Sequence, residues 1–575
     1  MIEKFRLVYG IGITGHVHIE SESISQAIRN VLSSIKKQYL KICEEYSDCF
    51  VGDGLYINSC LAFGADQLVA SEALTLGYRL NAFLPFDLKD SRTKLVYSSG
   101  DRDAFYYSLK CLLSKADSIL ELSSLCNSYP ENKEKLFRHR AFRSSSNTML
   151  NNSDILIAVW NGQESEAIGG TYQTIQNAIK SNKALITISP DGSSIICRYD
   201  YESKSFKELN VDELSLFVYD SLIKITPPHE KCLSVQKSLN TQLKEPPFWA
   251  KWNRVYNWIS PKIKSPNKDI SPSQTEPPQN ALTEILDKID GLSGYYAELF
   301  RTFFILAPVI GLFTVTLSAL SLVVTNVSFV FLLSLLALIL LFTYWGIYLF
   351  KVHYAWHKKL TEYRTLAETL RTQIYLIQTG VSSIDTNDYG IYDLSEFKWQ
   401  QDLIRIFVRS QGFPYTINWN NDKSRIKALM CSWIEDQIKY HDNNYKRSKY
   451  ANTRLTKWSA ILFVFTVLLV ILNVVISLPF ELSLTLKNLP IFLGLLGILA
   501  PLYATGIDAI SKYAEFSLLA ERSYGLSKSL RGFLKEIKQE DLYENLSLIS
   551  LECGRLMLNE TLEWNIHYRR IEIQK

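Results

Sequence analysis

Three short loops rich in glycine and small polar residues carry most of the chemistry available to the first 190 residues of this chain. They are Gly10-Ile11-Gly12-Ile13-Thr14-Gly15-His16, Gly64-Ala65-Asp66, and a longer segment from Asn161-Gly162 to Gly169-Gly170-Thr171. Glycine lets a backbone approach a ligand closely, and a loop that opens a helix presents amide N–H groups suited to an anion. The three loops together predict a site for a phosphate-bearing ligand.

The first loop fits the GxGxxG spelling of a dinucleotide-binding turn, but the match is weak. The polar stretch 16–23 stands where a helix should begin at once, and no acid closes a second strand at the usual distance. Taken alone, Gly12, Thr14 and Gly15 fit a tight turn as well as a phosphate cradle. His16 alone is more often a hydrogen-bonded loop residue than a catalyst.

The second and third loops each lead from a strand into a helix. Asp66 is either a first-turn acid that caps its helix or a ligand for a ribose hydroxyl. We expect phosphate on the amides of 64–66 and 169–171, with 14–16 closing a third side. Basic partners come from Arg138, Arg140 or Arg143, although a solvated helix face explains these arginines equally well.

The loops sit between alternating strand and helix patterns, which predicts an α/β Rossmann-like domain with a parallel sheet. Ligands in such folds bind at the carboxyl ends of the strands. The expected strands are Arg6–Ile13, Leu55–Cys60, Arg79–Phe83, Ser118–Leu122, Ile155–Trp160 and Ala184–Ile188, and the clearest expected helices are Ser25–Glu45, Ala65–Leu76, Lys133–Leu150 and Thr171–Lys180.

Two apolar hairpins follow, and they predict an all-α membrane domain with four spans. The spans are 303–325, 327–350, 458–478 and 489–507, none of which contains Lys, Arg, Asp or Glu. Each approaches the ~20 residues that cross a bilayer as a helix. Their hydroxyl groups are more often helix-packing groups than pore lining. Four spans are too few to enclose a wide pore, so we expect a homo-oligomer.

Charge sets the expected orientation and compartment. Basic residues flank the spans on the side of the long segments, so the positive-inside rule predicts that both termini are cytoplasmic. The nine cysteines are scattered without metal-ligand spacing, which suits a reducing compartment. A net charge of +4 argues against a dedicated nucleic-acid binder.

The hairpins are followed by matching sequences, Glu362–Glu368 and Glu515–Glu521, which lie 153 residues apart. This spacing predicts two copies of one unit: leading helix, membrane hairpin, exit helix. The apolar stripes of the exit helices either only pack the copies together or also transmit motion. A Ser/Pro/Lys-rich segment predicts a flexible tether, which favours activation by clustering of heads. The expected divisions are 1–190, 191–259 (extension), 260–281 (linker), 282–379 (first membrane unit), 380–440 (soluble helical insert) and 441–575 (second membrane unit).

Residues 5–190 resemble the SLOG superfamily, the Rossmann-like fold of the LOG phosphoribohydrolases and of bacterial nucleotide sensors. The resemblance is carried by Thr14-Gly15-His16, Gly64-Ala65-Asp66, Pro85-Phe86, Ser153-Asp154, Asn161-Gly162 and Gly169-Gly170-Thr171. The hairpins with their Leu-Ala-Glu exit helices resemble the SLATT domain, a membrane effector partnered with SLOG sensors in bacterial conflict systems. Here the hairpin occurs twice, which departs from the simple SLATT pattern.

The resemblance implies a nucleotide-signal-gated effector of the bacterial inner membrane, acting in antiphage abortive infection with a messenger synthase as partner. The ligand would be a nucleotide-derived messenger, such as a cyclic oligonucleotide or an ADP-ribose derivative; no cofactor or metal is implied. Gln173 stands where LOG hydrolases carry a catalytic glutamate, and a neutral amide is no general base. Alternatives are a membrane-tethered phosphoribohydrolase using Asp66 or Glu166, and a constitutive channel or scaffold.

Overall fold

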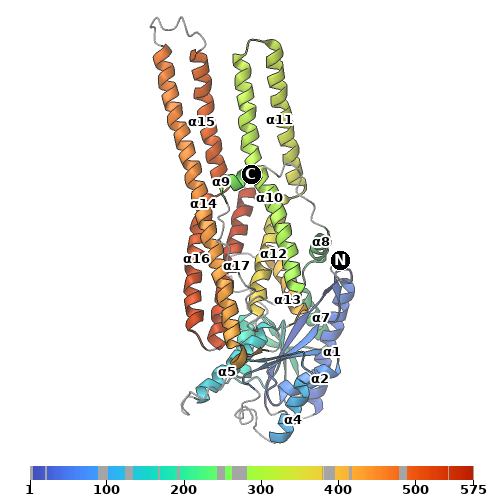
Figure 1. The fold of residues 1–575 in the computed structure, drawn as a ribbon. Helices are drawn as coiled ribbons and strands as arrows, with labels where there is room; N and C mark the ends of the chain where they lie inside the picture. Colours follow the sequence, from blue (N-terminus) through green and yellow to red (C-terminus); the bar gives the residue numbers. More distant parts are fainter. Residues whose placement is uncertain are drawn as a thin grey trace.

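The computed structural model describes residues 4–17, 19, 22–87, 102–122, 134–165, 169–190, 195–241, 253–261, 281–377, 380, 395–412, 417–477, 489–541 and 543–573. An α/β head lies at one end, a bundle of helices forms a stalk beside and above it, and four apolar helices extend from the stalk (Figure 1). The predicted α/β head with a mostly parallel sheet and the four long apolar helices are both present.

The head is built on a sheet whose described strands run in the order β10-β9-β8-β7-β2-β4-β5-β6-β11. Neighbouring strands are parallel throughout the series β8, β7, β2, β4, β5, β6 and β11. Strands β9 and β10 add an antiparallel edge next to β8. Chain order reverses between β2 and β7, so the carboxyl ends of these neighbours form a topological switch point. The strands are β2 Tyr9–Gly15, β4 Leu55–Ser59, β5 Arg79–Leu84, β6 Ser118–Glu121, β7 Ile155–Val159, β8 Ala184–Ile188, β9 Ile196–Asp200, β10 Ser205–Glu208 and β11 Ile417–Asn418; a separate pair is β1 Phe5–Arg6 with β3 Phe50–Val51.

Helices cover both faces of the sheet because its central strands are apolar on both sides; every residue of β7 is buried. One face carries α1 Glu22–Glu45, α2 Ala65–Thr75, α4 Arg102–Leu113 and α7 Val211–Ile223. The other carries α5 Glu134–Asn151 and α6 Thr171–Lys180, and its core continues into the stalk helices.

The stalk extends the head toward the membrane and contains two exceptionally long helices. It consists of parts of α10 Ala281–Val323 and α14 Trp419–Ser477 together with α12 Trp356–Leu376, α16 Phe516–Gln539 and α17 Tyr543–Ile573. At 1.5 Å per residue, the 59 residues of α14 span about 88 Å without interruption. Helix α17 contacts α12, α16 and α5, and so fills the space between the two exit helices.

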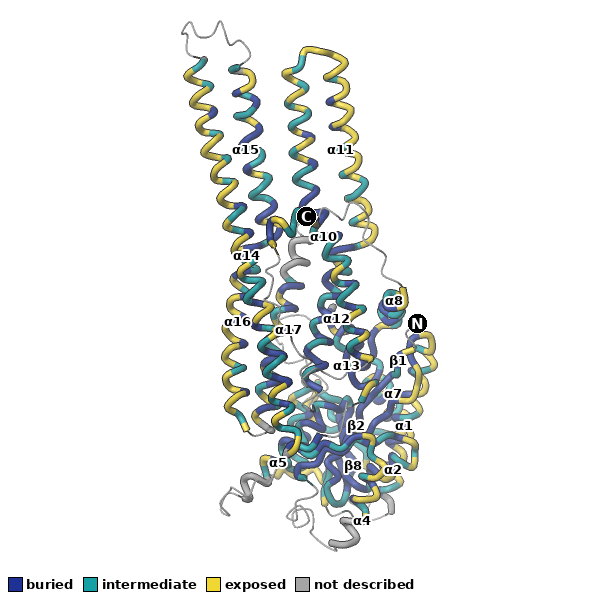
Figure 2. The backbone as a smooth tube through the Cα atoms, viewed as in Figure 1, coloured by how far each residue is buried: buried dark blue, intermediate teal, exposed yellow. Residues whose placement is uncertain are grey.

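The four candidate spans are the upper parts of α10 and α14, with α11 Val327–His353 and α15 Leu489–Tyr513. Exposed Leu, Ile, Val and Phe are concentrated on α11 and the upper part of α14. In Figure 2 these segments are largely yellow, whereas α15 is more buried. Such surfaces are stable only against lipid. The hairpins meet along α10 and α15, where the hydroxyls of Thr316 and Tyr503 lie 3.1 Å apart.

The segment 380–440, predicted to be a soluble helical insert, is mostly helical where it is described, and it also pairs with the sheet of the head. It supplies α13 Ser395–Ser410, the edge strand β11 and the start of α14. Strand β11 pairs with β6, and Phe407 of α13 packs its ring 4.4 Å from that of Phe5. The head is therefore joined to the stalk by ordered secondary structure. Of the predicted linker, residues 260–281, the stretch 262–280 lies outside the described residues.

The two halves share the order long helix, return helix, exit helix, but their details differ. The exit helices α12 and α16 follow left-handed residues, Ala355 and Glu515, which lie 160 residues apart rather than 153. Each exit helix packs along the long helix of its own half, α12 along α10 and α16 along α14, but α12 also contacts the head, where Tyr363 donates to Ser238. The exit helices consequently do not pack the two copies directly against each other.

Candidate functional site

The three predicted loops meet at His16, directly beyond the end of β2. The His16 backbone donates to Val159 O (3.1 Å), and its carbonyl accepts the N–H of Ala65 (3.1 Å). The N–H of Asn161 donates to His16 Nε2 at 3.2 Å, so Nε2 is the unprotonated ring nitrogen. His16 thus links all three loops at the β2–β7 switch point, where ligands bind in folds of this kind.

Only part of the predicted amide cradle remains open to a ligand. The N–H of Ala65 is taken by His16, and the N–H of Gly169 donates to the side-chain carbonyl of Gln173. Neither α2 nor α6 has a side-chain cap; their N-caps are Gly64 and Gly170. In the described structure the N–H groups of Gly170 and Thr171 find no protein acceptor, and they suit an anion.

The glycines of these loops answer different structural needs. Gly64, Gly162 and Gly169 have φ of 91°, 81° and 77°, in the left-handed region that favours glycine. A Cβ on Gly169 would lie 2.6 Å from Arg143 N, so the third loop rests on the backbone of α5. Gly170 has φ of −83° and is extended, a conformation open to any residue. Its substitution therefore tests ligand approach without backbone strain.

Two predicted site residues of β2 serve packing in this structure. A Cβ on Gly12 would lie 2.7 Å from Ser153 Oγ, because the turn between α5 and β7 crosses close to the strand. A Cβ on Gly15 would lie 2.4 Å from that of Ala65, so this glycine lets α2 approach the sheet. Thr14, between them, is buried near the strand end.

Asp66 lies in the first turn of α2 and is only 4% exposed. Desolvation raises the pKa of its carboxyl to about 7, although a hydrogen bond from the Ala62 backbone opposes the rise. The contact with Ala62 favours a loop-stabilising role. A ribose hydroxyl would reach this carboxyl only if the loop opened.

The remaining predicted residues lie along the same edge. Pro85 is buried after β5, and neighbouring Phe86 packs edge-on against Phe142 of α5 with ring centroids 5.6 Å apart. Arg143 lies next to the third loop through its backbone. Arg138 belongs to α5, but its side chain is outside the described residues, as is Glu166.

Sequence reasoning missed an aromatic pair beside the open amides. Trp160, at the end of β7, stacks on Tyr172 in the first turn of α6, with ring centroids 6.2 Å apart and planes 26° apart. Both rings are partly exposed. An aromatic face next to helix-end amides suits a base and its phosphate. In the sequence, this pair could have been recognised because Trp160 directly precedes the third loop and Tyr172 directly follows it.

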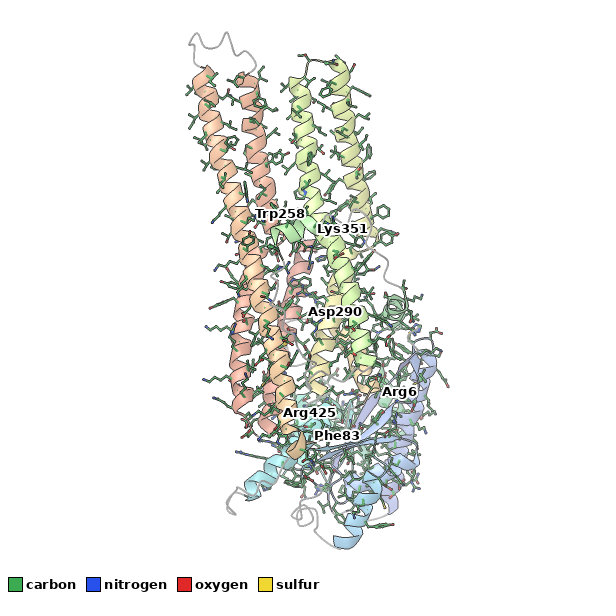
Figure 3. The ribbon with its side chains drawn as sticks, in the orientation of Figure 1. Arg6, Phe83, Trp258, Asp290, Lys351 and Arg425 are labelled. Atoms are coloured by element: carbon green, nitrogen blue, oxygen red, sulfur yellow. The ribbon has the colours of Figure 1, made fainter. Side chains whose placement is uncertain are left out.

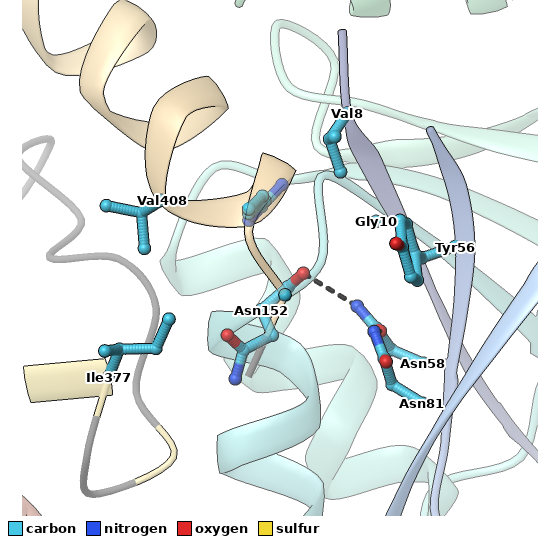
Figure 4. A pocket seen from close by; sticks show the side chains of 10 residues that line it. Val8, Gly10, Tyr56, Asn58, Asn81, Asn152, Ile377 and Val408 are labelled. Atoms are coloured by element: carbon cyan, nitrogen blue, oxygen red, sulfur yellow. Dashed lines mark hydrogen bonds between the residues drawn. The ribbon is translucent and has the colours of Figure 1, made fainter. Parts of the chain in front are cut away.

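A buried polar network links β4 and β5 to the turn before β7. Asn81 donates to Asn58 (3.0 Å), and Asn58 donates to Asn152 O (2.7 Å), as Figure 4 shows for the latter bond. The cavity beside them, lined also by Arg409, measures about 30 Å³. It has room for about one water molecule.

Asp154, of the Ser153-Asp154 pair, lies near the amino edge of the sheet and forms ion pairs with α13. Its carboxylate accepts the Gly10 N–H (2.9 Å) and pairs with Arg409 and, at 3.6 Å, Arg405. Burial alone would raise the pKa of Asp154, but the two guanidinium groups and the Gly10 N–H hold it below its usual range.

Aromatic and basic residues gather where the stalk meets the spans. The Arg454 guanidinium lies 3.7 Å from the ring centre of Trp258, and Lys351 Nζ lies 4.9 Å from that of Phe303. Figure 3 labels Trp258 and Lys351 at this level. Rings paired with long cationic side chains are typical of a membrane–water interface.

Comparisons of the chain with known protein families, curated proteins and solved structures find no match.

Proposed function

We propose that this protein is a nucleotide-responsive membrane effector. A nucleotide-derived ligand binds at the carboxyl edge of the head, and its binding changes the arrangement of the apolar helices. One observation carries the proposal: α14 starts at that edge and continues without a break into a span.

The start of α14 is tied to the carboxyl ends of β5 and β6, which lie farther along the same edge of the sheet as the candidate site. Asn418, the last residue of β11, donates its side-chain amide to Asp87 Oδ2 (3.1 Å) and to the Glu121 carboxylate. These acids follow or end β5 and β6. A ligand that shifts this edge would therefore move the base of α14.

The resemblance to SLOG sensors and SLATT effectors supports the same function. It adds the bacterial inner membrane, antiphage abortive infection and a messenger synthase to the proposal. The broad exposed apolar faces of α11 and the upper part of α14 fit assembly of several copies, so the proposed active form is a homo-oligomer that breaches the membrane.

Gly170→Glu tests the site. The added carboxylate would repel a phosphate at the α6 amides, so affinity for cyclic oligonucleotides and ADP-ribose should fall at least tenfold while the melting temperature stays unchanged. Gly532→Glu, on an exposed helical position with open space around it, is the matched control. Wild-type binding by Gly170→Glu, measured by calorimetry on the detergent-solubilised chain, would remove the site.

A phosphoribohydrolase is the second candidate, and Asp66 is the observation that favours it. A carboxyl with a pKa of about 7 is suited to general acid catalysis at neutral pH. Because the Asp66 carboxyl is buried and a substrate cannot reach it in this structure, the hydrolase is the second candidate. Release of free base and ribose phosphate from a nucleoside monophosphate, lost in Asp66→Asn, would establish the hydrolase.

A further inference from the structure

A second, larger cavity lies at the amino edge of the sheet, where the head meets the stalk. Its volume is about 300 Å³, at the lower end of the range for small-molecule sites. The head contributes the amino ends of β7 and β8 and part of α7. The opposite walls come from α12, α13 and one residue of α17. The cavity is therefore formed only when head and stalk are together.

The cavity is strongly cationic. Five basic side chains line it against two acidic ones, which leaves a formal excess of three positive charges; the basic residues are Lys183, Lys224, Lys398, Arg405 and Arg409. Asp154 and Asp402, the two acids, are engaged by Arg409 and Arg405. Concentrating like charges in a partly enclosed space is unfavourable unless an anion neutralises them.

The basic residues differ in how deeply they are buried in the cavity. Arg409 lies at the buried end, with 6% of its side chain exposed, and Arg405 is 15% exposed. Lys224, the residue that follows α7, and Lys398 of α13 are exposed residues at the rim. An anion entering the cavity would meet the lysines first and the guanidinium groups further in, a geometry suited to phosphate.

Uncharged groups complete the walls. Phe217 and Tyr201 supply aromatic surface on the head side, while Gln373 and Thr369 supply amide and hydroxyl groups from α12. A phosphate alone would use only the cationic part. A small organic phosphate with polar hydroxyls and a flat ring would use all of it.

We infer that this cavity is a binding site for a small organic phosphate of the size of a nucleoside monophosphate. The site is distinct from the carboxyl-edge loops, because Asp154 directly precedes β7 whereas Asn161 follows its end. It does not depend on the function proposed for those loops. A ligand here contacts head and stalk together, so its binding stabilises the docked arrangement.

The test is calorimetric titration of the full chain in detergent with AMP, ribose 5-phosphate and inorganic phosphate. We expect saturable binding of AMP, weaker binding of ribose 5-phosphate, and competition by inorganic phosphate. Lys398→Glu and Lys224→Glu, both at exposed positions, should each raise the Kd for AMP at least tenfold, or about 1.4 kcal/mol. Lys535→Glu, an exposed lysine of α16 remote from the cavity, should leave it unchanged.

Gly170→Glu separates the two sites. AMP binding that survives Gly170→Glu and is lost in Lys398→Glu belongs to the basic cavity. The reverse pattern places AMP at the carboxyl edge and overturns the inference. Absence of saturable binding by all three probes, or wild-type affinity in both lysine variants, overturns it as well.

Discussion

Asp66 shows how burial changes the behaviour of one carboxyl group. Its pKa rises from the ordinary value of 3.8 to about 7 in the folded protein, chiefly because of desolvation. Between these two values the unfolded chain is ionised at this position while the folded chain keeps the proton. The folded state binds more protons there, so stability falls as pH rises through this window and levels off above it.

We predict that Asp66→Asn removes this pH dependence. The variant should match the wild type near pH 4 and be more stable at pH 8, by at most about 4 kcal/mol. Thermal unfolding of the solubilised chain across this pH range measures the effect. Asp48→Asn, at an exposed position, is the control and should follow the wild type. Parallel pH profiles for Asp66→Asn and the wild type would show that the carboxyl is ionised when folded.

At the residue scale, the sequence predicted which loops meet but not what each residue does there. Glycines next to a strand end are visible in the sequence, and the parallel sheet brings such ends together. Whether a glycine admits a ligand or a neighbouring chain depends on distant residues: Gly12 faces Ser153, and Gly169 rests on Arg143. The hydrogen bonds that occupy the N–H groups of Ala65 and Gly169 could not be predicted from the sequence either.

At the element scale, long periodic or apolar segments were predictable and short or non-local ones were not. The spans follow from composition alone. Strand β11 has two residues and forms only by pairing with β6, nearly 300 residues earlier in the chain, so no local pattern announces it. This strand matters for the architecture because α14 begins directly after it and is therefore joined to the sheet of the head.

We predict that a break in α14 uncouples the head from the spans. Lys439→Pro removes one helical hydrogen bond at an exposed stalk position and costs about 3 kcal/mol locally. Ligand binding should persist, while ligand-dependent leakage from liposomes should be lost. Lys439→Ala and Lys535→Pro, which places the same break in α16, serve as controls. Normal leakage by Lys439→Pro would mean that α14 does not carry the signal.

At the scale of the whole molecule, the head is held against the stalk by contacts that bypass the segment 262–280. Lys231 of α8 His229–Asn240 pairs with Glu362 of α12 at 2.6 Å, and Tyr363 donates to Ser238 at 2.7 Å. The Asn152 side chain donates to Gly380 O at 3.0 Å. The sequence indicated a flexible tether and hence clustering of loosely attached heads; these contacts instead favour a mechanical connection. Pairs so far apart in the chain have no signature in a single sequence.

The final prediction separates the tether from this docked interface. Replacing residues 262–280 by a Gly/Ser segment of equal length should preserve ligand-dependent leakage, because the head remains attached through α13, β11 and α14. Glu362→Lys should reduce leakage by opposing Lys231 across the interface, where a partly buried like-charge pair is unfavourable. The exchange Lys231→Glu with Glu362→Lys should restore it by re-forming the ion pair. The prediction fails if linker replacement abolishes leakage and the single and double charge variants give the same leakage as each other. That result would place the coupling in the linker.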